Sequence, residues 1–312
     1  MAPAAAAFRE AEAALWRWAE GSPRELELTL RDGASVRAVE IGEGPAVVFI
    51  HGTTNSGASW AALASRLATD LRCIVLDRPG CGLSPALTTA VGVGGLRDHA
   101  DHFVADVLDA LGEEQGHVVS TSFGGLLALR GAAAHPERIR RILHFGWTMG
   151  ARVEKLPMVM RMAKLPGMAR LMAVMPVNER AVRSMFRQIG LKQALEAGRV
   201  PQQVVECYVA LLRHTDTMKN ELAMAGGTSL PGLIDALALE DELLARVTAT
   251  TRFVWGEEDP FGGPEAAAEF ASRLPNGELQ LVPGAGHAVW LDDLDLAVDA
   301  ARAHLSTNEG PG

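Results

Sequence analysis

The spacing of apolar residues changes along the chain. Residues 25–30 alternate polar with apolar side chains, which is typical of a strand with one solvated face, and Asp32-Gly33 before residues 35–41 predicts a hairpin. Further on, the apolar residues form unbroken runs, as in strands that are covered on both faces of a parallel sheet. These predicted strands are 46–50, 73–76, 117–119, 142–145, 252–255 and 279–282.

Helical spacing of apolar residues fills the intervals between the runs. The predicted helices are 59–68, 98–111, 123–135, 264–274 and 292–305. A first helix is expected at 4–19, with Leu15, Trp16 and Trp18 packed on the body of the protein. Because strands and helices alternate, we expect an α/β fold with a doubly wound, mostly parallel sheet.

One interval breaks this alternation. From residue 149 to residue 245 the patterns are helical and no strand is convincing, which predicts a helical cap inserted into the sheet. The expected domains are therefore 1–148 for the first part of the core, 149–245 for the cap and 246–312 for the second part of the core. The last residues, 306–312, are expected to be a frayed tail.

Composition narrows the class of protein. A chain of 312 residues can bury a large core, and its net charge of -9 argues against nucleic acid as a partner. We find no apolar run long enough to span a bilayer, so stable membrane insertion is not expected. The cysteines, Cys73, Cys81 and Cys207, lack metal-ligand spacing and are interpreted as reduced thiols of a cytoplasmic protein.

Two other motifs are interpreted as structural. His99 and His102 share one helical face, but no third ligand accompanies them, so a polar helical turn is favoured over a metal site. Residues 92–95 are rich in glycine, yet their spacing does not fit a dinucleotide-binding turn, and no strand precedes them. They are predicted to form a loop.

Ser122 is the candidate nucleophile of this chain. An apolar run ends at Val119, and a helical pattern begins just after Ser122, which predicts a sharp strand-to-helix turn that exposes the serine hydroxyl. Ser120 and Gly124 supply the small residues that such a turn needs, although glycine is usual at the position of Ser120. A serine at a helix N-terminus also lies beside unpaired N–H groups that stabilise negative charge.

A serine hydroxyl is a poor nucleophile until a base removes its proton. His287 follows the last predicted strand on a glycine-rich loop and is our candidate base. The base in turn needs a carboxylate to fix its tautomer. Asp259, after the preceding strand, is the candidate acid, and Glu258 is a weaker alternative. The earlier strand ends at residues 144–148 without a nearby carboxylate.

A developing oxyanion needs two donors. We assign one to the backbone N–H of Phe123, directly after the nucleophile, and the other to the backbone N–H of Thr53, where a strand gives way to a loop. His51 and Gly52 are expected to support this loop, as Gly124 supports the serine turn.

Together these motifs resemble the serial motifs of α/β-hydrolase fold enzymes in the branch with a serine nucleophile and a helical cap. The resemblance rests on His51-Gly52 with Trp60 downstream, on Asp77-Arg78-Pro79-Gly80-Cys81-Gly82-Leu83-Ser84, and on the segments around Ser122, Asp259 and His287. It covers most of the chain outside the cap, and its motifs are specific for fold and triad rather than for substrate. The Phe123-Gly124-Gly125 segment also resembles some carbon–carbon bond hydrolases.

The nucleophile narrows the reaction. A serine that attacked an epoxide or a haloalkane would be trapped as an ether, so Ser122 favours attack on an acyl carbon. We expect a serine hydrolase that cleaves an apolar carboxylic ester or lactone through an acyl-enzyme, with no cofactor and no metal. A carbon–carbon bond hydrolase or a biosynthetic acyl cyclase with the same triad is the alternative. A ligand-binding receptor of hydrolase fold is the alternative from another class.

The cap has an unusual composition. Ten of the eleven methionines lie between Met149 and Met224, and residues 151–220 carry 12 Lys and Arg against 5 Asp and Glu. One hypothesis is an adaptable apolar pocket for a small acyl substrate, with a cation that recognises an anionic group, and it involves Met158, Met172 and Met185. The other is a methionine-packed lid whose basic outside complements an acidic core. A homodimer is left open.

Overall fold

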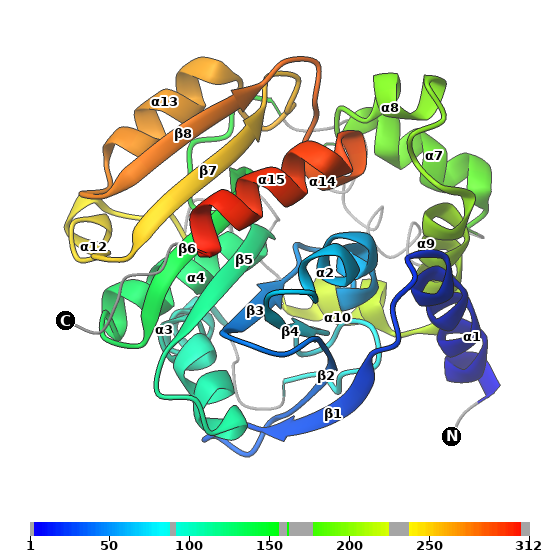
Figure 1. The fold of residues 1–312 in the computed structure, drawn as a ribbon, viewed down its shortest axis with the longest axis horizontal. Coiled ribbons are helices and arrows are strands. Elements are labelled where there is room, and N and C mark those ends of the chain that lie inside the picture. The colour runs from blue at the N-terminus through cyan, green and yellow to red at the C-terminus, as the bar shows by residue number, and fades with distance from the viewer. Residues whose placement is uncertain (1–2, 88–91, 156–160, 162–176, 225–236, 307–312) are drawn as a thin grey trace.

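A single eight-stranded sheet organises the protein (Figure 1). The computed structural model describes residues 3–87, 92–155, 161, 177–224 and 237–306. The strand order is β1-β2-β4-β3-β5-β6-β7-β8, with antiparallel pairs at the β1 end and parallel pairs from β4 onwards. The strands are β1 (Arg24–Thr29), β2 (Ser35–Ile41), β3 (Ala46–Ile50), β4 (Arg72–Leu76), β5 (Gly116–Ser122), β6 (Ile139–Thr148), β7 (Thr250–Gly256) and β8 (Gly277–Val282).

Helices cover both faces of the sheet, as the unbroken apolar runs predict. One face packs against α3 (Gly92–Leu111), α4 (Phe123–Ala134), α12 (Asp241–Leu244) and α13 (Pro264–Ser272). The other packs against η1 (Gly57–Trp60), α2 (Ala61–Leu67), α14 (Val289–Asp292) and α15 (Leu294–Leu305). Within β3, Val48 and Ile50 join the first core, whereas Val47 and Phe49 join the second, since side chains alternate across a strand.

The described part of the predicted cap is helical. It comprises α7 (Glu179–Gln188), α8 (Lys192–Glu196), α9 (Gln202–His214) and α10 (Thr217–Met224). The first helix of the chain, α1 (Pro3–Trp18), packs along α9 (Figure 1). Within the described residues, no helix is both long and apolar enough to cross a bilayer.

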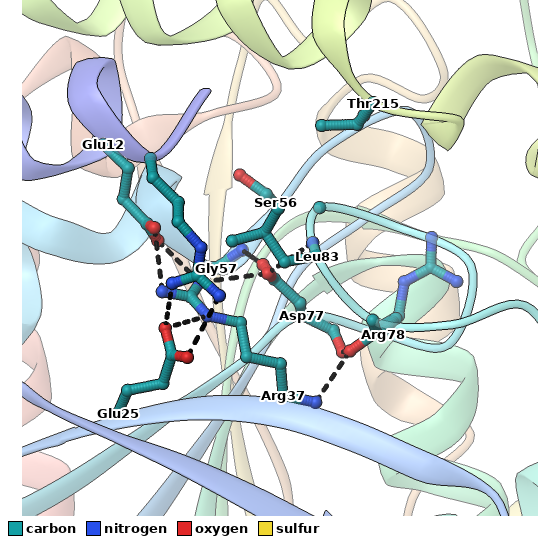
Figure 2. A network of polar contacts seen from close by, with 12 residues as sticks. Glu12, Glu25, Arg37, Ser56, Gly57, Asp77, Arg78, Leu83 and Thr215 are labelled. Atoms are coloured by element: carbon teal, nitrogen blue, oxygen red, sulfur yellow. Dashed lines mark hydrogen bonds and ion pairs between the residues drawn. The ribbon is translucent and has the colours of Figure 1, made fainter. Parts of the chain in front are cut away.

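A buried ionic network fixes α1 to the sheet (Figure 2). Arg37 of β2 donates from both terminal nitrogens to the Glu12 carboxylate of α1, at 2.8 Å each, and from Nη1 to Asp77 Oδ2 at 3.1 Å. Asp77 also accepts from the backbone N–H groups of Gly57 at 2.8 Å and Leu83 at 2.9 Å. The network therefore joins α1, β2 and the loop that follows β4.

Two predictions were wrong in detail. Residues 92–95 belong to α3 rather than to a loop, because Leu96 and Ala100 are buried one turn apart, and this packing outweighs the low helix propensity of glycine. Trp18 is 40% exposed, whereas Leu15 and Trp16 are buried. It is the last residue of α1 and lies about half a helical turn beyond Trp16, so it points away from the core.

Candidate active site

Ser122 occupies a strained turn between β5 and α4. Its backbone lies at φ 53° and ψ -119°, a left-handed φ that is uncommon for a residue with a side chain. A Cβ on Gly52 would lie 2.8 Å from Ser122 Cβ, and a Cβ on Gly124 would lie 2.2 Å from the carbonyl oxygen of Ile50. Only glycine therefore fits at either position while the serine turn keeps this geometry.

The unusual Ser120 has its own partner. Its hydroxyl lies 2.9 Å from Nδ1 of His144 on the neighbouring strand β6, and both side chains are buried. Burial lowers the pKa of His144 to about 3, so the ring is neutral at ordinary pH. Ser120 thus fills the place of the usual glycine with a hydrogen bond to a neutral ring beneath the serine turn.

Asp259 and His287 are brought together. His287 Nδ1 lies 2.8 Å from Asp259 Oδ2, and both residues are buried. Asp259 Oδ1 accepts the N–H of Phe261 at 3.0 Å, and its Oδ2 also accepts the N–H of Trp147 at 2.8 Å. Glu258, the weaker alternative, is exposed. The carboxylate of Asp259 is thus held by two backbone donors in the position that orients the ring.

The end of β6 connects this pair to Ser122. The N–H of Met149 donates to the carbonyl oxygen of Ser122 at 3.1 Å, two residues beyond the N–H that binds Asp259. Between them, Thr148 pairs in register with Ser122. A Cβ on Gly146 would lie 2.3 Å from the carbonyl oxygen of His287 and 3.1 Å from Asp259 Oδ2. One short stretch of backbone therefore contacts all three candidate residues.

The loop that carries His287 is held from the cap and from α14. The N–H of His287 donates to the carbonyl oxygen of Ile189, which lies between α7 and α8, at 2.9 Å. The neighbouring N–H of Gly286 donates to Asp292 Oδ2 at 2.7 Å. Burial raises the pKa of Asp292 to about 6.

His51 has no free nitrogen for base catalysis. Its Nε2 accepts the N–H of Arg78 at 3.0 Å, which leaves Nδ1 to donate to the carbonyl oxygen of Gly52 at 2.7 Å. Burial, and then the charge of Arg78, hold the pKa of His51 well below its usual value. The neutral ring braces the loop that leads to Thr53.

The proposed oxyanion donors flank the serine turn. Phe123 is the first residue of α4, so its backbone N–H is one of those that lack a partner within the helix. Thr53 follows Gly52, the residue that lies against Ser122. Thr53, Ser122 and Phe123 therefore gather at the carboxyl ends of β3 and β5, adjacent strands of the parallel sheet.

The sequence was also compared with known proteins. The model of the alpha/beta hydrolase family matches residues 47–300. The chain belongs to this family. The predictions of a hydrolase and of its fold, with a doubly wound and mostly parallel sheet, are thereby confirmed.

Proteins similar to this alpha/beta hydrolase include esterases and a dienoate hydrolase. A pimeloyl-[acyl-carrier protein] methyl ester esterase of Chromobacterium violaceum is 30% identical over 280 residues, 86% of this chain and 96% of that protein. A 2-hydroxy-6-oxo-6-phenylhexa-2,4-dienoate hydrolase of Burkholderia cepacia is 25% identical over 263 residues, 80% of this chain and 84% of that protein. The crystal structure of naproxen esterase (carboxylesterase NP) from Bacillus subtilis matches with a TM-score of 0.78 at 16% identity, covering 97% of this chain and 98% of that one.

Four contributors to the site were missed, or left without a role, by the sequence reasoning. Trp147 and Met149 act through backbone N–H groups, which leave no signature in the sequence. Asp292 lies five residues after His287, and the predicted helix 292–305 placed it at a helix start among other acidic residues, where Asp is common and gives no signal of a buried partner. Arg78 stands inside a motif that was recognised without a role for its side chain.

Two of the three methionines singled out for an acyl pocket, Met158 and Met172, lie outside the described residues. Met185 packs half-buried against the second core cluster.

Proposed function

We propose that this hydrolase is a serine esterase that cleaves apolar carboxylic esters or lactones, with Ser122 as nucleophile, His287 as base and Asp259 as orienting acid. The hydrogen bond between His287 Nδ1 and Asp259 Oδ2, at 2.8 Å, carries the proposal. Because Asp259 occupies Nδ1, the ring presents Nε2 as the nitrogen that can receive a proton. Ester hydrolysis also agrees with the activities for which two of the relatives are named.

In the proposed mechanism, Nε2 of His287 takes the hydroxyl proton as Ser122 Oγ attacks the acyl carbon. The N–H groups of Phe123 and Thr53 stabilise the oxyanion, and Asp259 stabilises the charged ring. His287 then gives its proton to the leaving alcohol, and the acyl-enzyme forms. Water, activated by the same ring, attacks this ester and releases the acid, which returns Ser122 and His287 to their starting states.

The substrate is proposed to be a small apolar acyl compound. Most of the described Lys and Arg residues of the cap that form hydrogen bonds or ion pairs form them with other residues of the cap. This favours a packing role over recognition of an anionic group. Arg183 donates to Gln202, Arg213 donates to the carbonyl oxygen of Val177, and Lys192 pairs with Glu196. An anionic group on the substrate remains the second hypothesis.

The proposal is tested with an activated ester such as a p-nitrophenyl ester and with a fluorophosphonate label. Ser122→Ala is expected to abolish both turnover and labelling, because no other group can form the acyl-enzyme in this mechanism. Ser272→Ala, which changes an exposed serine of α13, is the matched control and is expected to retain both. Full activity of Ser122→Ala would refute the assignment.

Carbon–carbon bond hydrolysis is the second candidate, and the Burkholderia cepacia relative favours it. A panel of p-nitrophenyl esters, lactones and vinylogous diketones separates the two reactions when each compound is offered to the wild type and to Ser122→Ala. The esterase proposal expects the highest kcat/KM on an ester or a lactone. A diketone that is cleaved faster than every ester supports the second candidate instead.

We also propose a cytoplasmic location, since Cys73, Cys81 and Cys207 are buried as free thiols. Sedimentation of the purified protein tests whether it forms the homodimer that the sequence leaves open.

A further inference from the structure

Arg78 lies buried between the proposed oxyanion loop and the cap, with 2% of its surface exposed. Its Nε donates to the carbonyl oxygen of His51 at 3.0 Å, and its Nη2 donates to that of Gly52 at 2.9 Å. The guanidinium carbon also lies 4.4 Å from the centre of the Phe123 ring. One side chain thus contacts Phe123, which carries one proposed oxyanion donor, and Gly52, which precedes the other.

The contact with Gly52 has a geometric consequence. The carbonyl group of Gly52 and the N–H of Thr53 belong to one peptide unit, which is planar and trans, so the two groups point in opposite directions. A donor that fixes the carbonyl oxygen therefore fixes the direction of the N–H. His51 Nδ1 donates to the same oxygen at 2.7 Å, so this carbonyl accepts two hydrogen bonds. Hydrogen bonds to a carbonyl polarise the peptide and strengthen the N–H as a donor.

The cap supplies the counter-ion of Arg78. Glu221 of α10 accepts from Arg78 Nη2 at 2.5 Å, and its side chain is 9% exposed. Two further hydrogen bonds hold α10 against the same loop: Asn220 Nδ2 donates to the carbonyl oxygen of Gly80, and the N–H of Gly82 donates to Thr217 Oγ1, both at 2.9 Å. The guanidinium turns away from the Arg37 network that surrounds the neighbouring Asp77 (Figure 2).

We propose that Arg78 is a positioning residue for catalysis: it aligns and polarises the Thr53 N–H through the Gly52 carbonyl, and Glu221 of the cap holds it in place. The proposal rests on the function proposed above. A residue that only anchored the cap would need the bond to Glu221, whereas Arg78 also satisfies two consecutive carbonyl groups next to the nucleophile. Its positive charge, shielded from water, further favours negative charge on a nearby oxyanion.

The decisive variant is Arg78→Lys, which keeps the charge but cannot contact both carbonyls and Glu221 with one planar group. Because the oxyanion forms only in the transition state, kcat on a p-nitrophenyl ester is expected to fall by about 10- to 100-fold with little change in KM. The affinity for a trifluoromethyl ketone, which forms a tetrahedral adduct with the serine, is expected to fall by a similar factor. Arg130→Lys is the matched control, since Arg130 forms a partly buried ion pair with Asp101 on another face and is expected to keep wild-type kcat.

A second measurement does not depend on turnover. Labelling glycine carbonyls with carbon-13 and threonine amides with nitrogen-15 selects only two peptides in the chain, Gly52–Thr53 and Gly227–Thr228. Thr228→Ser removes the second signal and so identifies the first. The Thr53 amide signal is expected to move in Arg78→Lys and, by less and in the same direction, in Glu221→Gln, which keeps the shape of the side chain.

An unchanged kcat in folded Arg78→Lys, or an unmoved Thr53 signal, overturns the proposal. If Arg78→Lys does not fold, the same two measurements on Glu221→Gln decide. The failure of the proposed function is distinct from this, because it shows as turnover by Ser122→Ala. If the wild type cleaves no ester at all, the Thr53 signal alone decides whether Arg78 polarises this peptide.

Discussion

Gly146 offers a direct test of how the candidate acid and base are held together. It lies near the end of β6 at φ +71°, and a Cβ there would lie 2.3 Å from the carbonyl oxygen of His287 and 3.1 Å from Asp259 Oδ2. Gly146→Ala therefore places a methyl group against both residues.

The size of the disturbance follows from these distances. An ordinary contact needs at least 3.4 Å, so the His287 backbone must move by about 1 Å. A displacement of about 1 Å in a catalytic group can cost roughly 100-fold in rate. We expect kcat/KM of Gly146→Ala to fall by about that factor, and its free energy of unfolding to fall by about 1–2 kcal/mol from the left-handed backbone alone.

Gly198→Ala is the control that separates strain from displacement. Gly198 has a similar φ of +68°, yet a Cβ there would meet nothing within 4 Å. The control is expected to lose a similar part of its stability from backbone strain while it keeps wild-type kcat/KM. Initial rates on a p-nitrophenyl ester and urea unfolding of all three proteins make the comparison. Equal kcat/KM values for the two variants would refute the argument that Gly146 spaces the acid and the base.

Two further predictions concern buried charge. Burial raises the pKa of Asp292 from 3.8 to about 6, so the protonated carboxyl stabilises the fold below about pH 4, and this contribution is lost as the pH rises to about 6. Asp292→Asn stays neutral and is therefore expected to gain up to about 3 kcal/mol relative to the wild type at pH 8, and progressively less towards pH 4. A difference in urea unfolding that does not change with pH contradicts this. Arg37→Met leaves the buried carboxylates of Glu12 and Asp77 without their cation, so the free energy of unfolding is expected to fall by about 3–5 kcal/mol at pH 7. Arg24→Met changes an exposed arginine and is expected to lower it by less than about 1 kcal/mol. Similar losses in the two variants contradict this.

The strands of the sheet could be predicted because burial on one face or on both leaves different patterns in the sequence. Residues 35–41 and 46–50 were predicted with the bounds that the structure gives to β2 and β3. The start of α3 could not be predicted, because four residues that include three glycines carry no helical signal. Their helix depends on packing that only the folded sheet provides.

The part of the candidate site that consists of side chains could be predicted from the sequence. Ser122, Asp259 and His287 each follow a predicted strand, and the choice of Asp259 over Glu258 agrees with the hydrogen bond to His287. The support from β6 was hidden, since backbone N–H groups are common to every residue. The bond between Arg78 and Glu221 joins positions 143 residues apart, and no local pattern connects them.

The packing of α1 along α9 links the two ends of a long stretch of chain. Residues 3–18 meet a helix that begins at residue 202, so the opening segment finds its partner only after most of the polypeptide has been made. A chimera that takes its cap from another hydrolase would leave α1 packed against a surface to which it is not matched. An exchange of the cap that aims to change the substrate range should therefore take α1 and the cap from the same parent protein.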